Sequence, residues 1–134
     1  MRLEFTLSDE PDYMLVSCHG DYDRPSMESM FAQVLAAAAD RKQPKVLFDF
    51  RSMTGNVPLS DKYFITDGLS QLCARYLPHL EFRLVCLGTE KQISQERFVE
   101  TVFRNRGGTG LVTTDPTEAD DWLRAQIDKP GGST

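Results

Sequence analysis

Acidic side chains follow an apolar run near the N-terminus, in positions where carboxylates could do chemistry. Asp21 and Asp23, after His19, form a D-x-D pair, a spacing at which two carboxylates can share a cation. Further oxygen ligands at loop spacing are missing from the sequence, so a helix N-cap at Asp23 is the stronger interpretation. The pair alone therefore predicts no metal site.

Asp49 lies between two phenylalanines near the end of another apolar run. A buried carboxylate can have a raised pKa and serve as a general base. Alternatively, Asp49 is structural, and it pairs with Arg51 or Arg83 or accepts hydrogen bonds from loop amides. An enzyme would need Asp49, His19 or Asp21 to converge in one cleft, and neither histidine has a nucleophile motif beside it. We therefore expect a protein without enzymatic activity.

The three cysteines, Cys18, Cys73 and Cys86, lie among apolar neighbours and form no C-x-x-C pair. This setting is typical of reduced thiols buried in a core, and it favours the cytoplasm as the compartment. The Cys/His spacing of a metal site is also missing. The glycine-rich stretch 107–110 follows a predicted helix, so it indicates a turn rather than a phosphate loop. We expect no cofactor.

The chain has 134 residues and a net charge of −5, which fits one soluble domain. The sequence has no basic run, and this argues against a nucleic-acid partner. No window approaches the ~20 apolar residues that a transmembrane helix needs. We expect a domain over residues 1–127, followed by a disordered tail over 128–134.

Five apolar segments have the pattern of β-strands. The first two are separated by a turn cluster at 9–12, and this short spacing predicts an antiparallel hairpin. The other three are short apolar runs that follow helical segments, as buried parallel strands do. The five segments are 3–7, 13–18, 46–50, 82–87 and 111–113.

Four segments have the apolar spacing of amphipathic helices, and they lie over 27–39, 63–76, 94–106 and 116–127. Asp23 or Ser26 can cap the first helix, and Asp115 with Pro116 and Glu118 forms the start signal of the last. The order is β-β-α-β-α-β-α-β-α. It predicts an α/β domain with a single mixed, mostly parallel five-stranded sheet and four helices that cover both faces.

Ligands of open α/β sheets bind beyond the carboxyl ends of the strands, and here the polar loop predicted after the third strand, 51–58, is the main candidate. Two aromatic residues at the start of the second helix line a pocket or an interface, or alternatively pack into the core. The candidate binding residues are Asp49, Arg51, Ser52, Thr54, Ser60, Tyr63 and Phe64.

Four short motifs follow one another in this framework: 46–51 before a glycine-containing loop, 83–88, 104–107 before the last strand, and 115–123. In this order they resemble the SpoIIAA-like group of bacterial domains, within the STAS and CRAL-TRIO-like fold class. The similarity extends over residues 3–127. The resemblance implies a non-enzymatic regulatory or protein-binding module.

Anti-sigma factor antagonists of the STAS class bind a partner kinase and are switched by phosphorylation of a serine at the start of the helix after the third strand. The usual Asp-Ser-Ser-Gly pattern is absent from 53–61, where Ser60 is the nearest serine and alternatively caps the helix. The CRAL-TRIO relationship implies a second function, a pocket for a lipid-like apolar molecule, lined by Met53, Tyr63 and Phe64. Self-association through an N-terminal strand edge or an aromatic patch is a further alternative.

Overall fold

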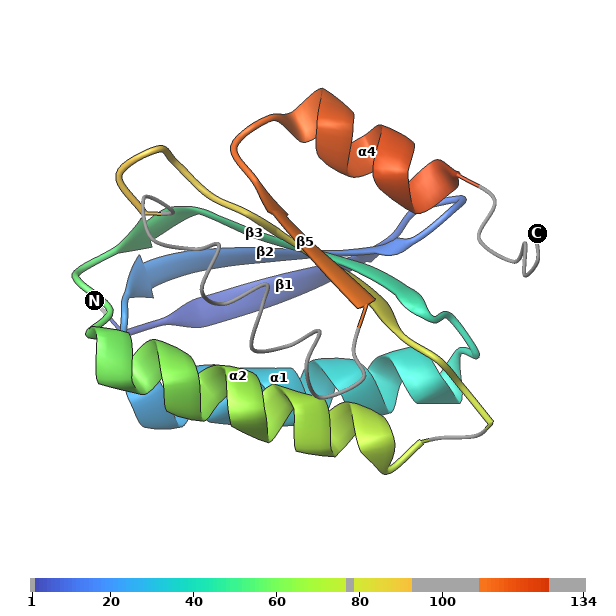
Figure 1. Cartoon of the computed structure of the whole chain (residues 1–134), viewed down its shortest axis with the longest axis horizontal. Helices are drawn as coiled ribbons and strands as arrows, with labels where there is room; N and C mark the ends of the chain where they lie inside the picture. The colour runs from blue at the N-terminus through green and yellow to red at the C-terminus, as the bar shows by residue number, and fades with distance from the viewer. Residues whose placement is uncertain (1, 77–78, 93–108, 126–134) are drawn as a thin grey trace.

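The computed structural model describes residues 2–76, 79–92 and 109–125. They form a five-stranded sheet in the order β1-β2-β3-β4-β5, in which β1 and β2 are antiparallel and the later pairs are parallel (Figure 1). This confirms the predicted mixed, mostly parallel sheet. The strands are β1 (Glu4–Asp9), β2 (Met14–Asp21), β3 (Lys45–Thr54), β4 (Arg83–Leu87) and β5 (Thr109–Thr113).

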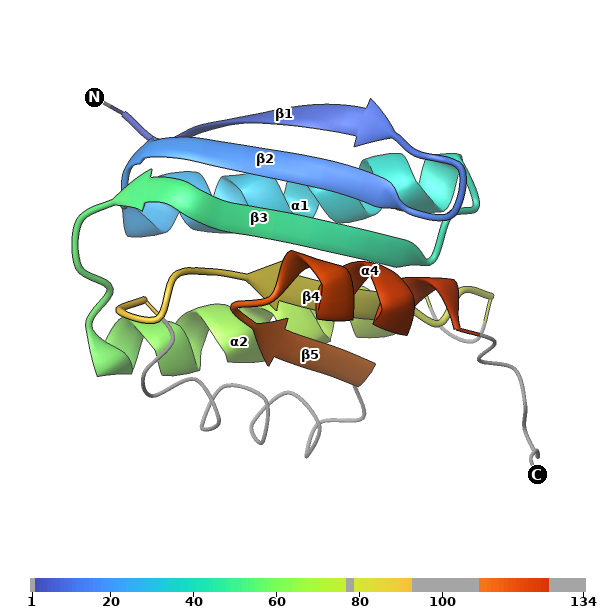
Figure 2. The ribbon, with the colours of Figure 1, turned by 90° about the horizontal axis from the view of Figure 1, so that it is seen from above.

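Helices cover both faces of the sheet. α1 (Arg24–Asp40) and α2 (Leu59–Ala74) lie side by side on one face, and α4 (Pro116–Arg124) lies on the other (Figure 2). Because β2, β3 and β4 are neighbours in sequence order, right-handed crossovers place α1 and α2 on the same face. Of the four helices expected, the described residues contain three. The helix expected over 94–106 and the tail expected over 128–134 lie outside the described residues.

Two of the expected helix starts are observed, with one difference in detail. The Asp23 carboxylate accepts a 3.1 Å hydrogen bond from the Ser26 amide at the start of α1, and Asp115 caps α4 by accepting at 2.9 Å from the amide two positions later. Glu118 does not close the expected capping box, because its carboxylate accepts from the Thr113 hydroxyl. The Asp115 amide donates to that same hydroxyl, at 3.0 Å.

The sheet separates two apolar clusters. The larger one lies between the sheet and α1 and α2, where Phe31 packs edge-to-face on Phe48 at 5.0 Å between ring centroids. The smaller one lies under α4 and contains Leu47, Val85, Leu87, Ala119 and Leu123. Among the helices that the structure describes, none is long and apolar enough to cross a membrane.

β3 extends to Thr54, into the segment that the sequence predicts as a loop. Ser17 on β2 pairs with Asp49, but His19 pairs with Ser52, so β3 contains one more residue than β2 between these pairs. Such an extra residue is a β-bulge, which re-aims the side chains beyond it. The predicted strand end was wrong because the last residues of β3 are mostly polar and lack the apolar pattern of a strand. They form a strand because they pair with β2, which is distant in sequence.

Candidate functional site

Asp49 and Arg51 form a local pair at the bulge of β3. The Asp49 carboxylate accepts hydrogen bonds from the Arg51 amide (3.1 Å), from its Nε (3.0 Å) and from an Nη (2.9 Å). Burial acts to raise the pKa of Asp49, but the hydrogen bonds from Arg51 outweigh burial and hold the pKa below its usual value. The carboxylate is therefore ionised at neutral pH, which fits the structural interpretation rather than a general base.

The other acidic and imidazole groups near this strand have separate partners. His19 Nε2 lies 3.4 Å from a Glu4 carboxylate oxygen on β1. Asp21 accepts from the Thr54 hydroxyl, which is also 3.2 Å from the Gly20 carbonyl oxygen, so Thr54 ties the ends of β2 and β3 together. No cluster of three metal-ligating side chains occurs among the described residues.

The loop after β3 leads directly into α2, which begins at Leu59. The N-cap position is occupied by Pro58, and no side chain caps the helix there. Ser60 is the second residue of the helix and is exposed, so the expectation that Ser60 caps α2 was wrong. Ser52, another candidate from the sequence, is exposed on β3 opposite His19.

Leu59, Tyr63 and Phe64 form an exposed apolar surface at the start of α2, which we call the α2 patch. Their exposed fractions are 52%, 39% and 52%, and the two rings pack edge-to-face at 5.8 Å. The buried stripe of α2 passes through Ile65 and Leu69. Because successive helical residues are ~100° apart, Tyr63 and Phe64 point away from that stripe. Neither ring packs into the core.

Polar contacts attach the α2 patch to the start of α1. The Arg24 guanidinium lies over the Phe64 ring, 4.9 Å from its centroid, and Arg24 Nη1 is 3.6 Å from Asp61. The Tyr22 hydroxyl donates a 2.8 Å hydrogen bond to Asp61. Burial, together with this hydrogen bond, raises the pKa of Tyr22, so the hydroxyl stays protonated as a donor. These contacts therefore hold the α2 patch against the start of α1, and the Arg24 guanidinium is the cation at its edge.

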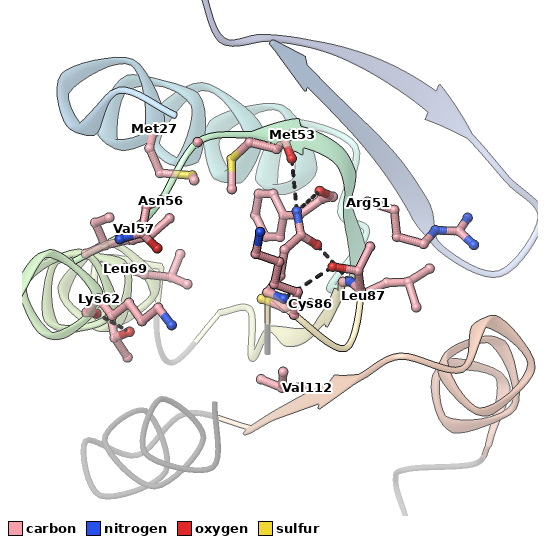
Figure 3. Close-up of a pocket in the computed structure, with 18 of the residues that line it drawn as sticks. Met27, Arg51, Met53, Asn56, Val57, Lys62, Leu69, Cys86, Leu87 and Val112 are labelled. Atoms are coloured by element: carbon pink, nitrogen blue, oxygen red, sulfur yellow. Dashed lines mark hydrogen bonds between the residues drawn. The ribbon is translucent and has the colours of Figure 1, made fainter. Parts of the chain in front are cut away.

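A cavity of about 670 Å³ lies between α2 and the sheet, and the loop after β3 forms part of its wall (Figure 3). Met53 lines it as expected, but Tyr63 and Phe64 are not among the described residues that do. The β3 bulge turns both Phe50 and Met53, three positions apart, toward this side. The apolar lining residues include Phe31, Phe50, Ile65, Leu69, Leu84, Leu111 and Val112.

Gln92, after β4, holds the bulge at the edge of this cavity. Its Nε2 donates to the carbonyl oxygens of Phe50 (2.8 Å) and Met53 (3.0 Å), and its Oε1 accepts from the Thr89 amide at 2.7 Å. Sequence reasoning missed Gln92, and it also missed Leu59 and Arg24. No spacing pattern marks a glutamine that pairs with carbonyls about forty positions away.

The three cysteines have different surroundings, although none of them is in a disulfide. Cys18 and Cys73 are buried, and burial raises the pKa of both thiols to about 12. Cys86 is half-buried and lines the cavity. Only Cys86 therefore departs from the expected core position.

No protein-family model matches the sequence, and no curated protein is significantly similar to it. The fold is similar to an uncharacterised DUF3478-family protein with a SpoIIAA-like fold from Shewanella loihica PV-4, at 20% identity and a TM-score of 0.53, over 90% of this chain and 93% of that one. An anti-sigma factor antagonist from Mycobacterium paratuberculosis gives 17% identity and a TM-score of 0.54, over 92% and 96%.

The anti-sigma factor antagonist SpoIIAA in its unphosphorylated form gives 19% identity and a TM-score of 0.57, over 93% of this chain and all of that one (100%). These identities are too low to transfer an activity, but the coverage on both sides is nearly complete. The arrangement of five strands with helices on both faces is thus a SpoIIAA-like fold.

Proposed function

We propose that this chain is a regulatory, protein-binding module of STAS type that docks its partner on the α2 patch. One observation carries the proposal: Leu59, Tyr63 and Phe64 are exposed side by side at the start of α2. Exposed large apolar side chains in a group are typical of interaction sites. Aromatic residues give large contact areas for little loss of side-chain entropy, and they are common at interface hot spots.

The surroundings of the patch support this interpretation. Arg24 presents a cation at its edge, and Asp61 and Tyr22 hold that arginine and the helix start in place. Two of the structural neighbours are anti-sigma factor antagonists. We place the module in the cytoplasm. Ser60 is exposed next to Leu59, and a phosphate there would add negative charge at the docking surface.

The test is capture of partners from native cell lysate with quantitative mass spectrometry, comparing the wild type with Phe64→Ser. We expect the specific partner to bind at least about thirtyfold more weakly to the variant, since hot-spot truncations cost ~2 kcal/mol or more. Leu7→Ser is the matched control, because Leu7 is 37% exposed on β1, outside the patch. The proposal fails if Phe64→Ser retains every protein that Leu7→Ser retains.

Self-association through the same patch is one outcome that this comparison can reveal. A second copy of the chain would bring two α2 patches together, and light scattering would then give twice the monomer mass. Phe64→Ser would restore the monomer, and Leu7→Ser would leave the dimer intact.

A further inference from the structure

β1 is the edge strand of the sheet, and no strand in the described part of the chain pairs with its outer side (Figure 2). Its six residues, Glu4–Asp9, include no lysine and no proline, which are residues that keep many edge strands from pairing with another chain. An edge of this kind is a template for a further strand. β1 is therefore the place in this fold where another chain can extend the sheet.

The hydrogen-bonding groups of the β1 backbone alternate in direction. Asp9 pairs with Met14, and the next amide, that of Glu10, donates to the Tyr13 carbonyl oxygen at 2.9 Å. In an antiparallel ladder, hydrogen-bonded pairs alternate with pairs that do not bond each other, so positions 5, 7 and 9 belong to the second kind. Their N–H and C=O groups therefore point away from β2, toward the open edge.

The apolar side of β1 is incompletely covered at this edge. Phe5 and Leu7 lie opposite two β2 residues of the larger apolar cluster, so they project on the α1 side of the sheet. Phe5 packs against that cluster, whereas Leu7 remains 37% exposed. Asp9, the acidic residue on the same side, forms an ion pair with Arg41 Nε at 3.0 Å. An added strand would therefore meet apolar side chains here, with the charge of Asp9 already matched.

A hollow of about 580 Å³ lies beside Phe5, between β1 and α1. Leu3 and Phe5 line it from the strand, and Pro25 and Met30 line it from the helix. Because β1 is the outermost strand, an apolar side chain from a strand added beside it can enter this hollow.

We propose that β1 pairs antiparallel with β1 of a second copy of this chain, around a two-fold axis that passes beside Thr6. Phe5 of each copy then lies opposite Leu7 of the other. This pairing joins the outward backbone groups of both strands and brings Leu7 to the hollow beside Phe5. The two five-stranded sheets become one continuous sheet.

Charge complementarity favours this register, and it favours a second copy as the occupant. The register places Arg2 of each copy opposite Glu10 of the other, and directly opposed charges of unlike sign stabilise a strand pair. Arg2 is exposed, and the Glu10 carboxylate accepts a 2.8 Å hydrogen bond from the neutral Ser8 hydroxyl, which leaves its charge in place. A two-fold axis beside Leu7 would instead oppose Glu4 and Glu10, two like charges.

Sedimentation equilibrium of the purified chain over a range of concentrations tests this pairing. We expect a mass that rises from one copy toward two, and a weaker dimer in each of two charge variants, Arg2→Glu and Glu10→Arg. Each variant opposes like charges twice per dimer, so its Kd should rise at least about tenfold. Asp121→Arg is the matched control, because it makes the same charge change as Glu10→Arg at an exposed position of α4, and its Kd should equal that of the wild type.

An equimolar mixture of the two charge variants is the decisive sample. When one copy of Arg2→Glu pairs with one copy of Glu10→Arg, both contacts again join opposite charges, so the Kd of the mixture should return to the wild-type value. Loss of folding in a single variant cannot be restored by mixing, and circular dichroism confirms that each variant is folded.

The inference does not depend on the docking role of the α2 patch, and each can fail alone. Leu7→Ser should raise the Kd of this dimer at least about tenfold, because it removes the contact with Phe5 twice, whereas Phe64→Ser should leave the Kd unchanged. A dimer that Phe64→Ser dissociates would overturn the proposal, as would charge variants that dimerise like the wild type or a mixture that stays monomeric. A wild type that is monomeric at every concentration would also overturn it, and would leave the edge to an extended segment of another protein.

Discussion

Gly20 lies where β2 passes close to the backbone of Arg2. Its φ is +99°, and a Cβ atom there would lie 2.3 Å from the Arg2 carbonyl oxygen. We expect Gly20→Ala to lower the free energy of unfolding by about 2 kcal/mol or more, because the strained backbone angle and the clash act together. Urea denaturation monitored by circular dichroism measures this loss.

Gly68 gives the matched control at the same scale. It lies within α2, and an added Cβ would meet no atom within 4 Å. Gly68→Ala should therefore raise the free energy of unfolding by roughly 0.5–1 kcal/mol, because alanine loses less backbone entropy in a helix. Equal effects of the two substitutions would contradict this account of Gly20.

At the scale of elements, Gln92 joins the segment after β4 to the bulge of β3. Gln92→Ala removes the donor to the Phe50 and Met53 carbonyl oxygens and should cost about 1–2 kcal/mol of unfolding free energy. Gln92→Glu keeps the shape but presents an acceptor to both carbonyls, so it should cost at least as much. Chemical denaturation of the two variants provides the comparison, and a stable Gln92→Glu protein would show that the hydrogen bonds do not hold the bulge.

The positions of the five strands along the chain and the starts of two helices could be predicted, because their signals are local. Alternating or continuous apolar runs mark the strands, and Asp23 and Asp115 cap the helices where the sequence indicated. The end of β3 could not be predicted, since its polar continuation is a strand only through pairing with β2. The helix predicted over 63–76 begins earlier, at Leu59. Pro58, directly before it, is a local signal that could have indicated this start.

The sequence could not predict how the candidate residues are arranged. The sequence placed Arg51, Ser60, Tyr63 and Phe64 in one region, and the structure separates that region into an exposed patch and a cavity. The division depends on the rotation of α2 about its axis. That rotation depends on which side chains of α2 pack on the sheet. The sequence does not show this, because Tyr63 and Phe64 lie in the same apolar run as Ile65, which is buried.

At the scale of the whole molecule, the loop between β3 and α2 connects the two candidate sites. Residues 53–59 line the cavity, and Leu59 also belongs to the α2 patch. The Asp49–Arg51 pair and Gln92 hold the strand end from which this loop departs. The α2 patch and the cavity therefore both border one short segment, and ionised and hydrogen-bonded groups hold the strand end from which that segment departs.

Several carboxylates make the stability of the whole chain dependent on pH. Four carboxylates have pKa values below the usual value. A hydrogen bond from Thr54 lowers the pKa of Asp21, one from Ser26 lowers that of Asp23, and one from Arg124 lowers that of Asp120. At Asp49, hydrogen bonds from Arg51 outweigh the effect of burial. A folded-state pKa below the unfolded value contributes stability above the unfolded pKa of about 4. That contribution is lost as pH falls through the folded-state pKa.

Asp49→Asn tests this dependence at the pair next to the candidate sites. The variant should be less stable than the wild type at pH 7, and the difference should shrink on acidification, because the wild-type carboxylate also becomes neutral. Arg51 is largely exposed, so we expect the coupling in a double-mutant cycle with Arg51→Gln to be about 1 kcal/mol or less. Urea unfolding of the four proteins from pH 7 to pH 3 gives both quantities. A stability difference that stays constant over this range would mean that the charge of Asp49 does not stabilise the fold.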